Sequence, residues 1–394
     1  MKIHRLVIIS GLFLAACSAE ARQRPKLPEI VFEWDAPIIL ERGGYTRVLR
    51  LSDERLMCSY THYGNGYACY SKDNGYSWGE PSIIMNKYEW SNENGSTVVG
   101  MHNPETMQLS VSNPYYPNRI FYIINLRPGD KKSSVHPYGI AYVTSDDNGQ
   151  SWSPMKTIFL SEQWDKDISK GCWEPYLMEL PDGNIQMYFA DETPYYKQGD
   201  KYQNISVMES SDGGDTWSEP RIVCYNPMFR DGMPVTMIYD GKIYLSIESN
   251  HVNIRLRPQI LYTSLKDNWK ETVGEYSKYR FNPFLVSRDS PDFVSGAPYL
   301  IQTEKFFVLS YQTSENADIT ISTQRIMEVQ ACLKSEMKKD KFHTMRSASR
   351  PIDVDPRSSH VMWNSLSPLG GDEIMACCQY NGKVTLVRGR IKTK

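Results

Sequence analysis

The chain has 394 residues, and its 44 basic and 46 acidic side chains give a formal net charge of −2. Balanced charge without a long basic run argues against a nucleic-acid-binding surface, and a hydrophobic fraction of 40% argues against a disordered chain. The 26 Tyr, 9 Trp, 25 Gly and 23 Pro residues are typical of many short strands joined by turns, with aromatic surface suited to sugars.

The first residues have the parts of a secretory signal. Residues 1–16 begin with basic side chains and continue with an apolar run too short to span a bilayer. Small residues then precede Cys17, which resembles the bacterial lipobox, in which the cysteine is lipidated. We therefore expect a signal peptide at 1–16, a lipid-anchored linker at 17–28 and a single folded domain at 29–394. The protein would be an exported bacterial lipoprotein, facing the periplasm or on the cell surface at the outer membrane, and touching the membrane only through this anchor.

Three later segments share one eight-residue pattern. Ser, Asp, Gly, Ser or Thr, and Trp recur at positions one, three, five, seven and eight of Ser71–Trp78, Ser145–Trp152 and Ser210–Trp217. The pattern suits a tight hairpin, because Asp accepts backbone N–H bonds, Gly takes a positive φ and Trp packs beneath the turn. These segments resemble the Asp boxes (BNR repeats) of sialidase-like β-propellers. Ser264–Trp269 looks like a degenerate fourth copy.

A longer period predicts how many units the fold contains. Turns followed by an apolar strand recur at Asp53, Asn118, Asp182, Asp240, Glu304 and Asp372. Successive turns are 65, 64, 58, 64 and 68 residues apart, so six units fill the chain behind the signal. We predict an all-β fold, a six-bladed β-propeller, whose turns join first to second strands and whose Asp boxes join third to fourth. The stretch Glu29–Leu40 is predicted to supply the outer strand of the last blade and so to close the ring.

Side chains equally far before and after each turn should meet at one mouth of the propeller, because the first strand starts at the face where the second ends. Counting in both directions gives twelve positions that are rich in acids, bases, amides and aromatic groups. They are Arg47, Asn103, Glu174, Asp231, Ser295, Trp363, His62, Arg127, Asp191, Glu248, Gln312 and Tyr380.

Glu174 and Glu248 are the candidate catalytic residues. They fall in neighbouring blades at the predicted mouth, and a carboxylate on an inner strand is costly unless it is paired or functional. Glycoside hydrolysis needs at least two carboxyl groups that face the same cleft. One protonates the leaving oxygen, and the other attacks the anomeric carbon or activates water. Retention and inversion both stay open, since the outcome depends on the separation of the pair.

The remaining candidates are assigned to substrate binding, each with a plainer alternative. The two arginines suit hydroxyls or a carboxylate but would equally neutralise the two acids. Asp191 would either partner a catalytic acid or hold an arginine, and the aromatic residues suit the core as well as a sugar platform. The assigned residues are Arg47, His62, Asn103, Arg127, Trp173, Asp191, Gln312, Trp363 and Tyr380. No metal-ligand spacing is present, and we expect no metal and no organic cofactor.

Longer segments resemble the exo-α-1,5-L-arabinanases of glycoside hydrolase family 93. The likeness is carried by 173–192, 231–248, 102–109 with 125–128, and 310–316, and it extends to 45–56 and 362–369. It implies a retaining six-bladed propeller that removes short arabinose units from chain ends. It also implies Glu174 as nucleophile and Glu248 as general acid/base, or these two roles reversed.

Two other functions stay open. An exo-sialidase, or another hydrolase of acidic sugars, would need three arginines around a carboxylate and Tyr380 close to the sugar carbon. The sialidase Arg-Ile-Pro is replaced here by Thr46-Arg47-Val48, which argues against this hypothesis. A non-catalytic glycan-binding propeller would hold its two carboxyls too far apart to cooperate. In every case the expected partner is an oligosaccharide or polysaccharide, and we expect a monomer that binds no nucleic acid.

Overall fold

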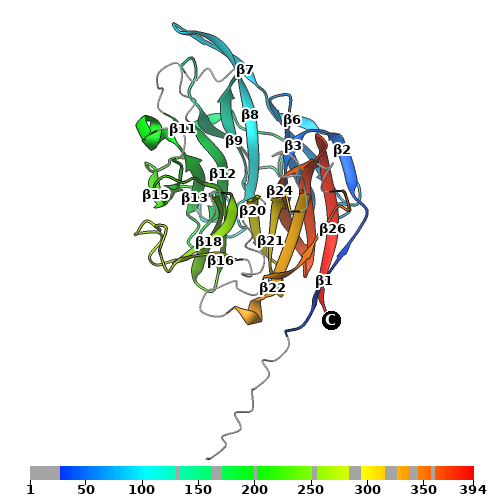
Figure 1. Cartoon of the computed structure of the whole chain (residues 1–394). Coiled ribbons are helices and arrows are strands. Elements are labelled where there is room, and N and C mark those ends of the chain that lie inside the picture. Colours follow the sequence, from blue (N-terminus) through cyan, green and yellow to red (C-terminus); the bar gives the residue numbers. More distant parts are fainter. Residues whose placement is uncertain are drawn as a thin grey trace, which may run out of the picture.

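The computed structural model describes residues 27–129, 134–161, 171–198, 202–250, 255–283, 294–315, 326–337, 345–355 and 360–394. They form six antiparallel sheets arranged as a six-bladed β-propeller (Figure 1), which confirms the predicted fold class. The predicted signal peptide and Cys17 lie outside these residues. In the described part of the chain, no helix has the length and apolar character needed to cross a membrane.

The strands of each blade follow the order of the chain. Blades 1 and 2 contain β3 (Gly44–Arg50), β4 (Leu56–His62), β5 (Asn65–Ser71) and β6 (Ser82–Met85), then β8 (Gly95–Gln108), β9 (Ile120–Pro128), β10 (Gly139–Ser145) and β11 (Lys156–Leu160). Blades 3 and 4 contain β12 (Cys172–Glu179), β13 (Ile185–Asp191), β14 (Asn204–Ser210) and β15 (Arg221–Cys224), then β16 (Asp231–Tyr239), β17 (Lys242–Ser249), β18 (Arg257–Ser264) and β19 (Arg280–Phe281). Blade 5 contains β20 (Ser295–Gln302), β21 (Phe306–Thr313), β22 (Ile326–Leu333) and β23 (Arg346–Ser349).

Blade 6 closes the ring with strands from both ends of the chain. Its inner strands are β24 (Val361–Gly370), β25 (Glu373–Tyr380) and β26 (Lys383–Thr393). The N-terminal strands β1 (Ile30–Trp34) and β2 (Ile38–Arg42) both pair with β26, and in Figure 1 the blue and red ends run together. The predicted closing strand is therefore confirmed.

An additional strand, β7 (Tyr88–Asn92), extends blade 2. It pairs with the first residues of β8, from Gly95 to Val99. This hairpin projects beyond the body of the propeller (Figure 1). The long β8 thus begins outside the blade and ends as its innermost strand.

The Asp boxes lie where they were predicted, between the third and fourth strands of blades 1, 2 and 3. In the first box, Asp73 accepts the backbone N–H of Ser77 at 2.8 Å and its hydroxyl at 2.5 Å. Ser71 accepts the N–H of Gly75 at 2.8 Å, where φ is +88°. The other two boxes repeat these bonds. These donors favour the carboxylate, and they lower the pKa of Asp73 to about 2.

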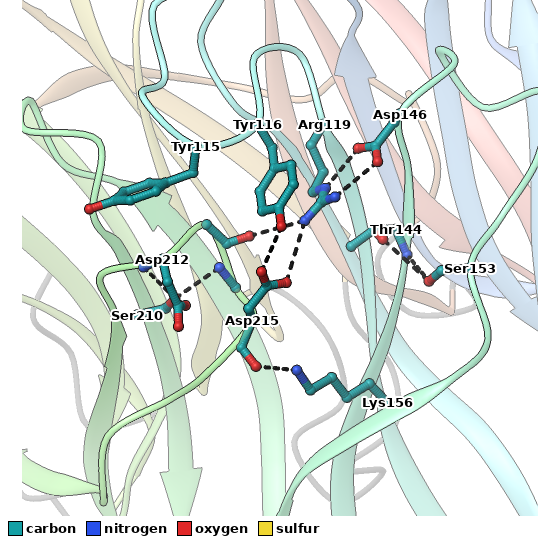
Figure 2. A network of polar contacts seen from close by, with 12 residues as sticks. Tyr115, Tyr116, Arg119, Thr144, Asp146, Ser153, Lys156, Ser210, Asp212 and Asp215 are labelled. Carbon is teal, nitrogen blue, oxygen red and sulfur yellow. Dashed lines mark hydrogen bonds and ion pairs between the residues drawn. The ribbon is translucent and has the colours of Figure 1, made fainter.

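One polar cluster on the Asp-box side joins blades 2 and 3 (Figure 2). Arg119, just after the first turn of blade 2, donates to both oxygens of Asp146 at 2.7 and 2.9 Å. Its guanidinium lies 3.1 Å from the ring centroid of Tyr116. The Tyr116 hydroxyl donates to Asp215 of the next blade at 2.6 Å. We call these four residues the inter-blade clasp.

The hydrophobic core lies between neighbouring blades, because each sheet buries both of its faces. Between blades 2 and 3, for example, Phe121 and Ile140 belong to one cluster with Leu177 and Phe189. This arrangement explains why strands such as β9 and β13 are almost continuously buried and apolar.

The innermost strand of every blade carries a β-bulge at the corresponding position. The ladder to the second strand shifts register there in all six blades. The bulge residues all have φ between 48° and 58°; they are Tyr45, Asn103, Glu174, Met233, Ala297 and Trp363. A positive φ is uncommon for residues other than glycine, and a bulge redirects the side chain. The bulges therefore decide which side chains face the mouth.

Candidate active site

The bulge side chains converge on the propeller axis. Tyr45, Met233 and Ala297 form a buried apolar cluster against Trp363. The Tyr45 hydroxyl lies 4.0 Å from the Met233 sulfur, so blades 1 and 4 touch across the ring. The floor of the mouth is thus apolar on this side, and the polar bulge residues are Asn103 and Glu174.

A second layer beneath the bulges closes the axis, and it contains Arg47. The Arg47 Nε lies 2.9 Å from a carboxylate oxygen of Glu105, and the two residues are only 3% and 6% exposed. Tyr299 donates to the same oxygen at 3.4 Å. Arg47 was predicted to bind substrate, but its charge is used to neutralise the buried Glu105. The reason is the bulge, which turns Tyr45 rather than Arg47 toward the mouth.

Glu174 and Glu248 lie against the same stretch of backbone. Glu174, on β12, accepts the N–H of Met233 at 3.3 Å. Glu248, near the end of β17, has one oxygen 3.6 Å from the position that a Cβ on Gly232 would occupy. Both carboxyls therefore flank the bulge of β16, although they come from different blades. Both residues are half-buried.

The other oxygen of Glu248 is held by the next blade. It accepts the N–H of Ala297, in the bulge of β20, at 2.7 Å. A Cβ on Gly296 would lie 2.6 Å from this oxygen. Glycine at this position therefore leaves the space that the carboxylate occupies. The short backbone hydrogen bond stabilises the ionised form of Glu248.

The environment of Glu174 favours its protonated form. Burial, together with the negative charge of Glu248, raises its pKa to about 7. The charge of Arg127 and the N–H of Met233 act in the opposite direction but do not cancel the effect. One carboxyl of the pair is thus able to hold a proton near neutral pH, while the other accepts a backbone hydrogen bond.

A cavity of about 400 Å³ opens at the same mouth, on the side of blades 1, 2 and 6. It is lined by four of the predicted binding residues: His62, Asn103, Arg127 and Trp363. An adjoining cleft of about 520 Å³ shares Tyr63, His102 and Arg127 with this cavity and is lined by the predicted Trp173. The structure therefore brings five predicted binding residues to two connected hollows beside Glu174.

Arg127 is held in place by amide groups. Its Nε donates to Asn125 at 3.2 Å, and one terminal nitrogen donates to Asn103. Asn125 in turn donates to the backbone carbonyls of Gly139 and Cys172 at 2.9 and 2.8 Å. The guanidinium lies 4.8 Å from the ring centroid of Trp173. An arginine anchored by neutral groups keeps its charge available for a ligand.

His102 lines both hollows and was not among the predicted site residues. Its burial and the neighbouring Arg127 lower its pKa to about 4. The imidazole is therefore neutral at physiological pH and acts there as a hydrogen-bonding group rather than as a cation.

Three predicted binding residues lie elsewhere. Asp191 is buried, accepts the N–H of Thr193 at 2.9 Å and faces a separate hollow between blades 2 and 3. Tyr380 packs against the apolar core of blades 5 and 6. Gln312 is buried and accepts the N–H of Trp363 at 2.9 Å, so it supports the bulge of β24 from below the surface.

The positions of Asp191 and Tyr380 are related to strand pairing. The second-strand residues opposite the start of each bulge are Thr61, Asn125, Ala190, Glu248, Gln312 and Gln379. Asp191 and Tyr380 lie one residue beyond this set, and successive side chains of a strand point to opposite faces. Gln379, which lines the cavity, was missed for the same reason. Asp231, counted two residues too early, forms a buried ion pair with Arg280 at 2.6 Å.

A sequence signal for the bulges was available. In four inner strands the bulge residue is followed by proline: Pro104, Pro175, Pro234 and Pro298. Proline within a sheet is found at bulges because it cannot donate to the ladder. Aligning the blades on these prolines would have identified Met233 and Ala297, although Tyr45 and Trp363 lack the signal.

Within the described residues, no group of His, Cys, Asp or Glu side chains is arranged to hold a metal ion.

Comparisons with known proteins agree with this architecture. The BNR repeat-like domain family matches residues 139–273. No curated protein sequence gives a match. The Penicillium chrysogenum α-L-arabinanase in complex with arabinobiose superposes with a TM-score of 0.63 at 16% identity, covering 90% of this chain and 98% of that one. The family 93 α-L-arabinofuranosidase of Fusarium graminearum with arabinobiose gives 0.62 at 17% identity, covering 91% and 98%.

A sialidase shares the fold at lower similarity. The K499G mutant of NanB sialidase from Streptococcus pneumoniae superposes with a TM-score of 0.55 at 12% identity, covering 90% of this chain and 70% of that one. These superpositions show a shared fold, and at identities of 12–17% they show no more than the fold. Function has to be argued from the site.

Proposed function

We propose that this protein is an exo-acting glycoside hydrolase that cleaves α-L-arabinofuranosyl chain ends with retention of configuration. We further propose that it is exported and anchored through Cys17, as its N-terminal sequence predicts. The observation that carries the proposed activity is the pair Glu174 and Glu248, which flank one bulge at the mouth of the propeller. The structurally similar arabinanase and arabinofuranosidase were both solved with arabinobiose, which supports a furanosyl substrate.

In this mechanism Glu174 is the general acid/base and Glu248 is the nucleophile. Glu174 is suited to carry the proton because its pKa is raised to about 7. Glu248 is suited to attack because the Ala297 N–H stabilises its carboxylate. This assignment exchanges the two roles that the family resemblance implies. It follows the rule that the two carboxyls of a glycosidase are set apart by their environments.

The reaction then takes two steps. Glu248 attacks the anomeric carbon and forms a glycosyl ester while Glu174 gives its proton to the departing glycosidic oxygen. Glu174, now ionised, takes a proton from water, and that water cleaves the ester and releases the sugar. Arg127 and Asn103, which line the cavity, are placed to bind hydroxyls of the sugar during both steps.

The alternatives have less support from the site. A sialidase would need three arginines around a carboxylate, whereas Arg47 is paired with Glu105 and the arginines among the described cavity-lining residues are Arg42 and Arg127. Tyr380, which would be the nucleophile in that case, is half-buried and packs against the apolar core of blades 5 and 6. A binding-only propeller does not account for two carboxyls on one bulge, one of them with a raised pKa.

The activity is tested by neutralising each carboxyl in turn. Glu174→Gln and Glu248→Gln should each lower kcat on arabinotriose by about 10³-fold or more, because each removes a group that acts in the transition state. Glu179→Gln makes the same change at the other end of β12 and should leave kcat unchanged. Proton NMR of the first product gives its anomeric configuration. Normal turnover by both active-site variants would overturn the proposal.

The two roles are separated by leaving group and by azide. Glu174→Ala should still cleave 4-nitrophenyl α-L-arabinofuranoside, whose leaving group needs no acid, and added azide should yield a glycosyl azide of retained configuration. Glu248→Ala should be inactive on both substrates, with azide yielding the inverted product. The opposite pattern would restore the roles that the resemblance implies.

A further inference from the structure

The two hollows at the mouth carry an excess of positive charge. Of the described residues that line them, three are cationic, namely Arg42, Lys87 and Arg127, and none is acidic. His102 adds no charge to this count at neutral pH, since its pKa is lowered to about 4. A neutral sugar does not require three cations around its site.

These cations differ from other arginines of the protein. Arg47, Arg119 and Arg280 are each bound to a carboxylate at 2.9 Å or less. Among the described residues, no carboxylate lies within ion-pair distance of Arg42, Lys87 or Arg127. Arg127 is bound instead to the neutral amides of Asn103 and Asn125.

Arg127 and Lys87 belong to the adjoining cleft. Arg127 lies at its boundary with the cavity, stacked on Trp173, the residue before Glu174. Lys87, in the segment between β6 and β7, is held by its backbone N–H, which donates to Asn65 at 2.8 Å. Its side chain passes close to Gly64, whose φ of +77° lets the chain turn there. Tyr63, 72% exposed, stands at the rim that both hollows share.

We propose that the adjoining cleft binds an anionic sugar unit, bearing a carboxylate or a sulfate, next to the unit that is cleaved. The planar guanidinium of Arg127 retains N–H donors for such a group, and Lys87 supplies a second point charge. Trp173 and Tyr63 provide aromatic faces for the ring. Which unit is cleaved rests on the proposed function, but the recognition of an anion does not.

Binding is measured by calorimetry on the full chain carrying Glu248→Gln, so that no turnover intervenes. The probes are trigalacturonate for carboxylate, a sulfated chondroitin disaccharide for sulfate, and neutral arabinotriose. At about 25 mM NaCl at least one anionic probe should bind about tenfold more tightly than arabinotriose, and this advantage should shrink at about 300 mM NaCl. Preference for one anionic probe identifies the chemical group, and either preference supports the proposal.

Matched lysine variants test the location. Lys87→Gln should weaken binding of the anionic probe about threefold to tenfold without changing the affinity for arabinotriose. Lys72→Gln makes the same change on the opposite face, in the first Asp box, and should have no effect. Equal affinity for neutral and anionic probes, no binding of either anion at millimolar concentration, or equal effects of the two lysine variants would overturn the proposal. Loss of hydrolysis in the carboxyl variants has no bearing on this result, so the two proposals fail separately.

Discussion

Glu174 combines an unusual backbone conformation with an unusual side-chain environment. Its φ of 54° places it in a bulge rather than in the regular ladder. The bulge brings its carboxyl to the Met233 N–H and close to the charge of Glu248. Such strain persists only where the surrounding structure enforces it, and it clusters at functional sites. At the scale of one residue, the bulge and the raised pKa are therefore parts of the same arrangement.

This environment predicts how activity depends on pH. Because the pKa of Glu174 is raised from its ordinary 4.5 to about 7, the protonated form needed for acid catalysis is lost above pH 7. The rate on arabinotriose should then fall by about tenfold per pH unit. Measuring kcat/KM from about pH 4 to pH 9 tests this. A flat profile up to pH 9 would contradict the assigned role.

The same shift affects stability with a definite sign. Between about pH 4.5 and pH 7 the folded chain keeps a proton on Glu174 that the unfolded chain releases, so the free energy of unfolding falls as pH rises through this window. Glu174→Gln removes this contribution. As pH rises through the window, the melting temperature of the wild type should therefore fall relative to that of the variant. If the melting temperatures of the two proteins change with pH by the same amount, the pKa of Glu174 is not raised.

At the scale of elements, the Asp boxes do more than turn the chain. Asp146 and Asp215 follow the third strands of two successive blades, and both contact the Tyr116 and Arg119 pair of the inner turn (Figure 2). A local hairpin motif thereby becomes a contact between neighbouring sheets. The inter-blade clasp supplements the apolar core between blades 2 and 3 with directional bonds.

Removing the central member of the clasp should destabilise the fold without changing the site. Arg119→Gln loses two charge-assisted hydrogen bonds and a stacking contact, and we expect a loss of about 2 kcal/mol in the free energy of unfolding. Glu54→Gln, which removes an exposed ion pair with Arg50, should cost less than about 0.5 kcal/mol. Urea denaturation of both variants checks the difference. Equal effects would mean that the clasp adds nothing to stability.

For the molecule as a whole, ring closure depends on the N-terminal strand β1, which is far in sequence from the other strands of blade 6. β1 completes blade 6 by pairing with β26, and Ile30 joins the apolar cluster that contains Val387 and Ile391. The Trp34 indole donates to Ser349 of blade 5 at 2.9 Å. These contacts cover the edge of β26 and attach the last blade to its neighbour.

Two truncations test the closure. A chain that begins at Leu27 retains β1 and should melt with the full-length protein and elute as a monomer. A chain that begins at Ala36 lacks β1 and leaves an apolar edge strand uncovered, so we expect a melting temperature lower by about 10 °C or more, or association into larger species. Light scattering and calorimetry measure both outcomes. Equal melting of the two truncated chains would rule out a role for β1 in closure.

The blade number, the closing strand and the strand order could be predicted from the residues alone, because those features depend on local chemistry. An Asp box makes its hydrogen bonds within eight residues, and a turn needs only its own few residues. Each therefore appears in the same form wherever it recurs, and its spacing counts the blades. The proximity of the two glutamates was also predicted this way, since carboxylates on apolar strands stand out from their neighbours.

Which side chains share the mouth could be seen only in the folded chain. Each bulge inserts one residue into the inner strand, and a shift of one residue moves a side chain to the opposite face. This shift put Arg47 against Glu105 beneath the mouth and brought Tyr45 in, whereas Asp191, Gln379 and Tyr380 follow the pleat of the second strands. The charges of the cleft likewise come from segments that no short motif connects. Their proximity is set by how blades 1 and 2 pack around the axis.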